Sequence, residues 1–550
     1  MRYFTVASVF SDYCVLQRGK DFCVFGCSSG FEGESVKCVL RSGEKILSSS
    51  ENRIVSEKWA VILPGTEARN DCILEVSCGG TVKVFNHVAV GEVWIAGGQS
   101  NMEFEIGSCT EKEEAFPESG DEGVRFYYTQ KIGWLDDSFY EKEKNTGWEI
   151  FSSAKKKQWS AVGYFFAREI SKRLGVTVGI IGCNWGGTSA TSWIDVQSLR
   201  NEKYLDVYFE PYEKESAGKS IEEQCRIFDE YTAYHDEWQK KCDALYRENP
   251  SIQWQEVIDA IGVCEWPGPK VCKNPLRPGG LYECMISRIM PYTVKGVIYY
   301  QGESDDKHSH LYEKLFTLLI KKWREYFNSP ELPFVFVQLP EHRYAADMDF
   351  KNWCIIRENQ MKVRDFVRNT FMVSALDQGE YNDIHPKHKK VLALRMADCA
   401  LSNCYGTDAG HETENPAFES CTIEKNKIRV LIKRSGSGLE LHEDTAELQH
   451  LIEMERKQGN RIPEDFSGFE IAGSDRKFYP ASVRISGSCS NIIEAESPFV
   501  KEPLYIRYAW YNYGPVTVFS KEGLPLCPFR NYSGTDEGTE SADIQQVMEL

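Results

Sequence analysis

Several features are scarce or missing in this 550-residue sequence. It has no window of about 20 consecutive apolar residues, so it predicts no transmembrane helix and no membrane partner. Basic residues are in deficit, because 64 Lys and Arg face 82 Asp and Glu and leave a net charge of −18. That charge disfavours binding to nucleic acid or to an anionic membrane, whereas a neutral sugar meets no such repulsion.

Short cysteine spacings of the zinc-site kind are also missing, although the chain has 19 cysteines. The N-terminus carries no apolar core followed by a small-residue cleavage site, so no secretory signal is expected. Scattered, odd-numbered cysteines then favour reduced thiols, and we expect a cytoplasmic protein. No internal repeat and no Gly-x-Ser-x-Gly elbow occur, since Ser189 and Ser304 lie beside glycines without completing that motif.

Three regions with different patterns follow one another along the chain. Residues 1–90 contain short apolar runs between Gly-, Ser- and Asn-rich turns, the spacing of a β-sandwich. Residues 91–404 alternate strand and helix patterns, which predicts a parallel sheet covered on both faces. A charged helical segment at about 197–262 interrupts this alternation and is interpreted as an insertion that forms a wall or lid. Residues 405–550 return to β patterns and end in a tail that is expected to fray.

The polar clusters of the central region follow the ends of its expected strands. Strands are predicted at residues 93–96, 176–181, 294–300, 334–338 and 371–375, and helices at 159–174, 311–327, 352–367 and 387–401. Parallel strands bring their carboxyl ends to one edge of the sheet, where α/β proteins assemble their sites. The chemistry is therefore expected at that edge.

Ser100 follows the first of these strands and two glycines. If it begins a helix, its hydroxyl can act as a nucleophile and its own N–H as an oxyanion donor. Alone, the stretch favours an ordinary helix cap, which is the commoner role of Ser at such a place. The partners found later in the chain reverse that preference.

His385 is the best-placed base for Ser100 among the ten histidines, because it follows a strand on a defined turn. Asp383 is the nearest acidic candidate for orienting its ring, and Asp377 and Glu380 share the loop. His385 and His388 suggest a metal pair, but no third ligand is recognisable, so no metal site is predicted.

Oxyanion donors are expected from the Ser100 N–H, the backbone N–H of Gly187 or Gly186, and the Gln301 amide. Asn101, Trp185 and Glu303 lie beside these residues in the sequence and are candidate substrate contacts.

Glu303 and Asp305 offer a different interpretation, that of a paired-carboxylate glycosidase. It ranks lower, because it leaves Ser100, Gly187 and His385 without roles. A third possibility is a carbohydrate-binding protein with an inactive esterase site, which the many aromatic residues allow. The intact Ser100 and His385 argue against it.

The chain resembles the sialate O-acetylesterase family of SGNH-type hydrolases over nearly its whole length. The motifs are Phe10-Ser11-Asp12 with Val15-Leu16-Gln17-Arg18, Gly91-Glu92-Val93-Trp94 with Gly98-Gln99-Ser100-Asn101-Met102, Asn184-Trp185-Gly186-Gly187-Thr188, Tyr300-Gln301-Gly302-Glu303-Ser304, Asp377-Gln378-Gly379-Glu380 with Asp383-Ile384-His385-Pro386, and Arg507-Tyr508-Ala509-Trp510 with Leu524-Pro525 and Pro528-Phe529-Arg530. Several motifs in the family's order make chance an unsatisfactory explanation.

This resemblance implies a flavodoxin-like three-layer α/β/α catalytic domain between β-sandwich-type domains, with no metal or organic cofactor. It implies that Ser100 is the nucleophile, that His385 is the base, and that Gly187 and Gln301 are oxyanion partners. The SGNH class places its acid three residues before the histidine, where this chain has Asn382. A dyad and a triad with Asp383 both stay open.

The function expected from the resemblance is a carbohydrate O-acetylesterase. Its substrate would be an acetylated mono- or oligosaccharide, either a sialic acid or a plant-type xylo-, manno- or xyloglucan oligosaccharide. The oligomeric state is left undetermined by the sequence.

Overall fold

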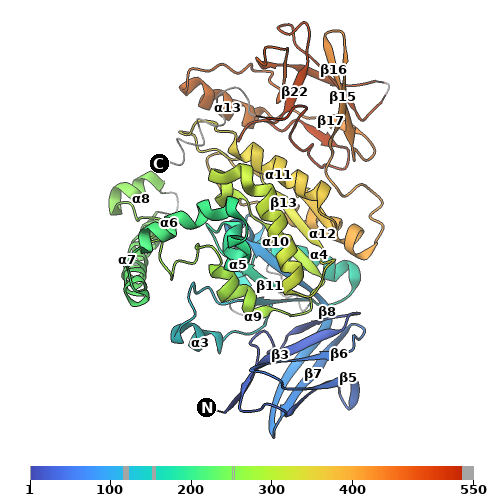
Figure 1. Cartoon of the computed structure of the whole chain (residues 1–550). Coiled ribbons are helices and arrows are strands. Elements are labelled where there is room, and N and C mark those ends of the chain that lie inside the picture. Colours follow the sequence, from blue (N-terminus) through green and yellow to red (C-terminus); the bar gives the residue numbers. More distant parts are fainter. Residues whose placement is uncertain are drawn as a thin grey trace.

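A central parallel sheet organises the computed structural model, which describes residues 2–115, 123–151, 156–249, 252, 254–487 and 489–534. The expected mixed α/β class is confirmed, with β-rich segments at both ends of the chain (Figure 1). The predicted frayed tail lies outside the described residues. No helix in the described ranges is long and apolar enough to cross a membrane. All 19 cysteines are free thiols.

The central strands run in the order β10-β9-β11-β8-β12-β13-β14, and every pair except β10–β9 is parallel. Their bounds are Thr81–Gly98 for β8, Val124–Tyr128 for β9, Glu149–Ile150 for β10, Val178–Asn184 for β11, Gly296–Tyr300 for β12, Phe334–Gln338 for β13 and Thr370–Ser374 for β14. Strands β11, β12 and β13 are buried at every residue, as expected for a parallel sheet covered on both faces.

Helices cover both faces of this sheet. Successive side chains of a strand point to opposite faces, so Trp94 and position 97 of β8 face opposite ways. Trp94 packs against Phe166 of α4 with ring centroids 5.1 Å apart, whereas a Cβ at Gly97 would lie 2.9 Å from Trp323 of α10. Helix α12 packs against α4, and α11 packs against α10. These helices are Ala161–Leu174 (α4), Tyr312–Tyr326 (α10), Asn352–Phe366 (α11) and Lys390–Tyr405 (α12).

The N-terminal strands are joined to the central sheet by β8. Its first half pairs with β2 and β7, and its second half pairs with β11 and β12. The predicted boundary between residues 90 and 91 therefore falls inside one continuous strand. The chain is also buried without interruption from Val88 to Gly98. The other strands here are Tyr3–Val6 (β1), Val15–Gln17 (β2), Phe22–Ser29 (β3), Ser35–Ser42 (β4), Lys45–Arg53 (β5), Lys58–Leu63 (β6) and Arg69–Cys78 (β7).

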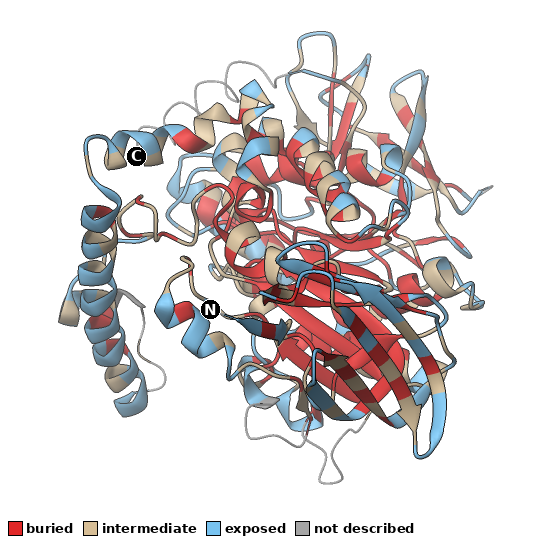
Figure 2. Cartoon of the chain, turned by 60° about the horizontal axis from the view of Figure 1, so that its bottom comes forward, coloured by how far each residue is buried: buried red, intermediate tan, exposed pale blue. Residues whose placement is uncertain are grey.

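The segment expected as a helical insertion is helical. It contains Val196–Arg200 (α5), Asp206–Ser216 (α6), Ile221–Glu248 (α7) and Trp254–Ile261 (α8). Helix α7 is largely exposed, and its buried residues are Gln224, Trp238 and Cys242 (Figure 2). Shorter helices elsewhere in the first 300 residues are Ser100–Glu103 (α1), Lys112–Ala115 (α2), Asp137–Glu143 (α3) and Ser287–Ile289 (α9).

The C-terminal region is built of short strands but also holds helix α13, Thr445–Lys457, which the sequence interpretation assigned to a β region. Its buried residues Leu448, Leu451, Ile452 and Met454 have helical spacing, so the signal was present in the sequence. The strands are Ala417–Glu424 (β15), Lys427–Lys433 (β16), Leu439–Leu441 (β17), Phe469–Ala472 (β18), Tyr479–Pro480 (β19), Ser482–Ile485 (β20), Ile492–Glu496 (β21), Tyr505–Tyr508 (β22), Val518–Ser520 (β23) and Phe529–Arg530 (β24).

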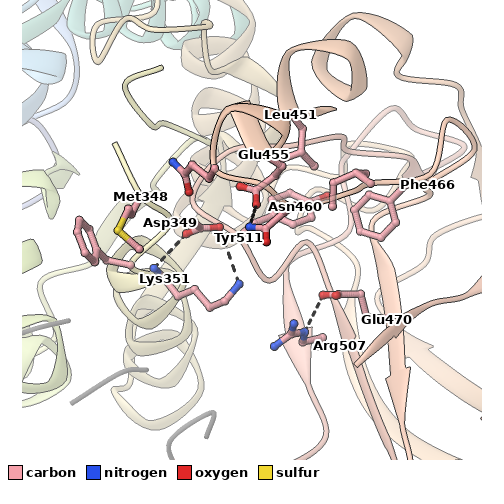
Figure 3. A pocket seen from close by; sticks show the side chains of 13 residues that line it. Met348, Asp349, Lys351, Leu451, Glu455, Asn460, Phe466, Glu470, Arg507 and Tyr511 are labelled. Carbon is pink, nitrogen blue, oxygen red and sulfur yellow. Dashed lines mark hydrogen bonds and ion pairs between the residues drawn. The ribbon is translucent and has the colours of Figure 1, made fainter. Parts of the chain in front are cut away.

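Buried Arg357 of α11 ties this C-terminal region to the central domain. Its guanidinium donates to the carbonyls of Leu339 and Pro340, which follow β13, and to those of Tyr511 and Asn512. A cavity of about 280 Å³ opens at the same junction, between the loop before α11, helix α13 and strands β18 and β22 (Figure 3). Two ion pairs lie on its wall, Arg507–Glu470 at 2.7 Å and Lys351–Asp349 at 3.8 Å.

Candidate active site

Ser100 and His385 meet at the carboxyl edge of the sheet, although 285 residues separate them. Ser100 is the first residue of α1, immediately after β8, and His385 lies on the loop that follows β14. The Ser100 Oγ and the His385 Nε2 are 2.8 Å apart. This is the contact that a serine nucleophile and its general base require.

The turn that presents Ser100 depends on Gly98. Gly98 has a φ of 132°, and a Cβ there would lie 2.1 Å from the Tyr300 carbonyl oxygen of the neighbouring strand β12. Only glycine fits such a conformation at such a distance. As the first residue of α1, Ser100 also has an N–H that the helix itself does not use.

The second glycine loop lies directly against Ser100. A Cβ at Gly186 would be 3.3 Å from the Ser100 Cβ, and Gly187 has a φ of 74°. Glu103 of α1 fixes this loop, because its Oε2 accepts a hydrogen bond of 2.7 Å from the Gly186 N–H. Lys131 contacts the other Glu103 oxygen at 2.5 Å. Glu103 was missed by sequence reasoning, since its partner is distant in the chain.

Gln301 is placed differently from the expectation. It is 1% exposed, and its amide nitrogen donates to Asp305 Oδ2 at 2.6 Å and to the Thr188 carbonyl at 3.2 Å. A side-chain amide has only two hydrogens, so both are committed inside the fold. In this structure the Gln301 amide therefore holds the loop that carries Gly187, and its role as an oxyanion donor stays a prediction.

Asp383 lies close to His385 but contacts its backbone. The Asp383 Oδ1 accepts a hydrogen bond of 2.9 Å from the His385 N–H. Within the described residues, no hydrogen bond joins this carboxylate to the His385 ring. Asp383 thus shapes the loop through the His385 backbone.

Asn101 and Glu303, predicted as substrate contacts, are buried behind Ser100 and His385. Asn101 is 0% and Glu303 5% exposed, and the Asn101 amide donates to Glu303 Oε1 at 2.7 Å. The same amide donates to the Ile384 carbonyl at 3.0 Å, which links the residue after Ser100 to the residue before His385. These two side chains are therefore buried supports of the loop that carries His385, and their contact with a substrate stays a prediction.

Lys389 completes this support and was also missed. It is 1% exposed and donates to Asn101 Oδ1 at 2.7 Å. Burial lowers its pKa to about 7, against the opposing influence of nearby Glu303. Burial likewise raises the pKa of Glu303, although the Asn101 hydrogen bond opposes this shift. The sequence offered no signal beyond a lysine four residues after His385.

Burial lowers the pKa of His385, and the positive charge of Lys389 lowers it further. Asp383 and Glu103 oppose this shift. The ring is therefore held in its neutral form, in which Nε2 can accept the serine proton.

Asp305 is fully buried and accepts hydrogen bonds from Ser189, Ala190, Tyr208 and Gln301. Neither of the two carboxylates of the glycosidase interpretation is therefore open to a sugar. Trp185 is half-buried beside the glycine loop, and its role as a sugar contact stays a prediction. In the described part of the chain, no group of three His, Cys, Asp or Glu side chains is arranged to hold a metal ion.

The chain is similar in sequence to known carbohydrate esterases. Residues 261–402 match the family model "Carbohydrate esterase, sialic acid-specific acetylesterase". The sialate O-acetylesterase of Mus musculus is 24% identical over 96% of this chain and 94% of its own length, and that of Homo sapiens is 25% identical over 97% and 94%. This chain is similar to the sialate O-acetylesterases along nearly its whole length. The resemblance inferred from the motifs is thereby confirmed.

A solved structure agrees with this relationship at the level of the fold. A carbohydrate acetylesterase from Xanthomonas citri is 24% identical, with a TM-score of 0.70 over 97% of this chain and 100% of that chain. The segment matched by the family model contains Gln301, Glu303, His385 and Lys389, whereas Ser100 lies before it. The sialate O-acetylesterase relatives span Ser100 as well, and together with the family model they indicate an esterase.

Proposed function

We propose that this protein is a carbohydrate O-acetylesterase that uses Ser100 as nucleophile and His385 as general base. The observation that carries the proposal is the 2.8 Å contact between Ser100 Oγ and His385 Nε2, beside a glycine loop. The relationship to the sialate O-acetylesterases supports an acetylated sugar as substrate.

In the first half of the reaction, Ser100 Oγ attacks the acetyl carbonyl carbon while His385 Nε2 takes the hydroxyl proton. The Ser100 and Gly187 N–H groups stabilise the oxyanion of the tetrahedral intermediate. The intermediate collapses by breaking the bond to the sugar oxygen, which takes the proton from His385. The sugar leaves with a free hydroxyl, and Ser100 carries the acetyl group.

Water completes the cycle. His385 takes a proton from the water as its oxygen attacks the acetyl carbonyl, and then returns that proton to Ser100 Oγ as acetate leaves. Glycosidic bonds are untouched throughout.

We also infer that residues 91–404 form an SGNH-type three-layer domain and that residues 1–90 and 405–550 form β-sandwich-type domains. The helices on both faces of the sheet support the first inference. Limited proteolysis tests the division, and first cleavage between residues 405 and 416 is the expected result.

Release of acetate from 4-nitrophenyl acetate tests the mechanism. Ser100→Ala is expected to lower kcat by a factor of about 10³ or more, because the nucleophile is lost. Ser304→Ala is the matched control, since its hydroxyl lies at the same sheet edge and has no proposed role. Equal, slow rates for wild type and Ser100→Ala would favour a carbohydrate-binding protein with an inactive site. Reducing ends released from an unacetylated oligosaccharide would favour a glycosidase.

A further inference from the structure

Trp266 lies beside the proposed oxyanion loop, on the segment that leads from helix α8 back to the central sheet. A Cβ at Gly187 would be 3.2 Å from the Trp266 Cζ2 atom. The neighbouring Gly186 lies against Ser100, where its Cβ would be 3.3 Å from the Ser100 Cβ. The two glycines therefore separate the nucleophile from this indole ring, and one wall of the site is aromatic.

Trp266 is unusual among the tryptophans of this protein because it is 60% exposed. The other tryptophans whose side chains the structure describes are buried or partly buried. Leaving an indole in water forgoes burial of a large apolar surface, of the order of 200 Å². An exposed aromatic ring beside a catalytic loop is the feature expected of a ligand contact.

The Trp266 segment is held firmly by the helical insertion. Tyr231 of α7 donates from its hydroxyl to the Glu265 carbonyl at 2.8 Å. Asn274 donates to the carbonyls of Pro267 and Pro269 at 3.3 and 3.0 Å. The ring thus stands on an ordered segment, so a ligand that stacks on it does not have to order the segment first.

The charges around the catalytic pair favour a neutral ligand. Lys131 is paired with Glu103 at 2.5 Å, and Lys387 lies 3.9 Å from Asp383. These cations are already matched by carboxylates, and exposed Glu265 directly precedes Trp266. A sugar that carries its own carboxylate would meet repulsion at this wall, whereas a neutral pyranose would not.

We propose that Trp266 forms a glycan subsite on which a neutral pyranose ring packs its apolar face, so that the substrate is an O-acetylated neutral oligosaccharide of at least two rings. The acetylated ring faces Ser100, and the adjoining ring packs on the indole. This inference rests on the proposed esterase function. It assigns the recognition of the glycan to the segment that follows the helical insertion.

The test compares three substrates on the full chain: a monoacetylated xylo-oligosaccharide, 9-O-acetylated N-acetylneuraminic acid and 4-nitrophenyl acetate. For Trp266→Ala, the ratio of kcat/KM on the xylo-oligosaccharide to kcat/KM on 4-nitrophenyl acetate is expected to fall about tenfold or more, mainly through KM. Trp266→Phe keeps a flat ring and is expected to recover most of the ratio. Phe499→Ala removes a 72% exposed aromatic side chain in the C-terminal region and serves as the control.

Four outcomes would contradict parts of this picture in distinguishable ways. An unchanged kcat/KM on both the xylo-oligosaccharide and 4-nitrophenyl acetate in folded Trp266→Ala would overturn the subsite. An equal fall on both substrates would also overturn it, because Trp266 would then only support the Gly187 loop. A higher kcat/KM of wild type on the sialic acid than on the xylo-oligosaccharide would overturn the neutral substrate class. A wild-type enzyme that released no acetate from any of the three esters would overturn the proposed function itself.

Discussion

At the residue scale, the charge of His385 controls the pH dependence of the proposed reaction. The ring acts as a base only when neutral, and burial together with Lys389 lowers its pKa. We therefore expect kcat/KM to rise with pH and to reach its half-maximum below pH 6.5, the usual pKa of a histidine. Stopped-assay profiles on 4-nitrophenyl acetate between pH 4 and 7 measure this midpoint.

Lys389→Met is expected to move that midpoint to higher pH. The variant removes a positive charge that lowers the pKa of His385, so the ring stays protonated up to a higher pH. The pH profiles of the variant and wild type are compared below pH 7. Burial lowers the pKa of Lys389 to about 7, so its ammonium is charged mainly below that pH. Lys387→Met, which changes a neighbouring exposed lysine, is the control. A midpoint that stays in place or falls in Lys389→Met would contradict the proposed electrostatic link.

Asp383→Asn separates a dyad from a triad. The asparagine Oδ1 can still accept the hydrogen bond from the His385 N–H, so we expect kcat to stay within about tenfold of wild type. Asp383→Ala removes that acceptor and is expected to cost more. A fall of about 10⁴ in kcat for Asp383→Asn would instead identify an aspartate that fixes the tautomer of the ring.

The residues proposed to carry the chemistry were easier to choose from the sequence than the residues that hold them in place. Ser100 and His385 could be chosen because each follows the end of a recognisable strand and has a reactive side chain. Lys389 could not be chosen, because its partner Asn101 lies 288 residues away and neither a lysine nor an asparagine is diagnostic of a catalytic site. Gln301 was assigned to the oxyanion because an amide can donate, and only the fold shows that Asp305 and Thr188 take its hydrogens.

At the element scale, the turn between β8 and α1 depends on Gly98. Gly98→Ala is expected to destabilise the protein by about 3 kcal/mol or more and to abolish most activity, because its Cβ would lie 2.1 Å from the Tyr300 oxygen. Gly175→Ala is the control, since Gly175 has a φ of 66° and open space around it, and should cost only about 1 kcal/mol. Urea unfolding measures both, and equal costs would show that the Tyr300 contact is not limiting.

The central elements were predictable from the sequence because they are long or strongly apolar. Strand β13 and helix α11 lie within a residue of their expected bounds, since buried strands read as continuous apolar runs and α11 has a helical stripe. Short strands such as β9 were missed, although Val124–Tyr128 is part of the sheet. The boundary expected at residue 90 lies within strand β8. An apolar run in the sequence does not show where a strand changes its pairing partners.

At the scale of the whole molecule, Arg357 couples the C-terminal region to the catalytic sheet. Its buried guanidinium donates to four carbonyls, two after β13 and two in the segment 511–512. Asn512 then accepts from the Trp353 N–H at 3.1 Å and from the His342 N–H at 2.8 Å, so this segment supports both the start of α11 and the loop before it. Removing Arg357 therefore affects two domains at once.

Arg357→Lys keeps the charge but cannot reach four carbonyls, because an ammonium lacks the planar set of donors. We expect a loss of about 3 kcal/mol in unfolding free energy, since buried carbonyls lose their partners. We also expect faster proteolytic cleavage between residues 405 and 416. Arg484→Lys alters an exposed pair with Glu494 in the same region and should leave the urea midpoint and the cleavage rate unchanged. Unaltered cleavage in Arg357→Lys would mean that the junction is held by its apolar contacts and not by this arginine.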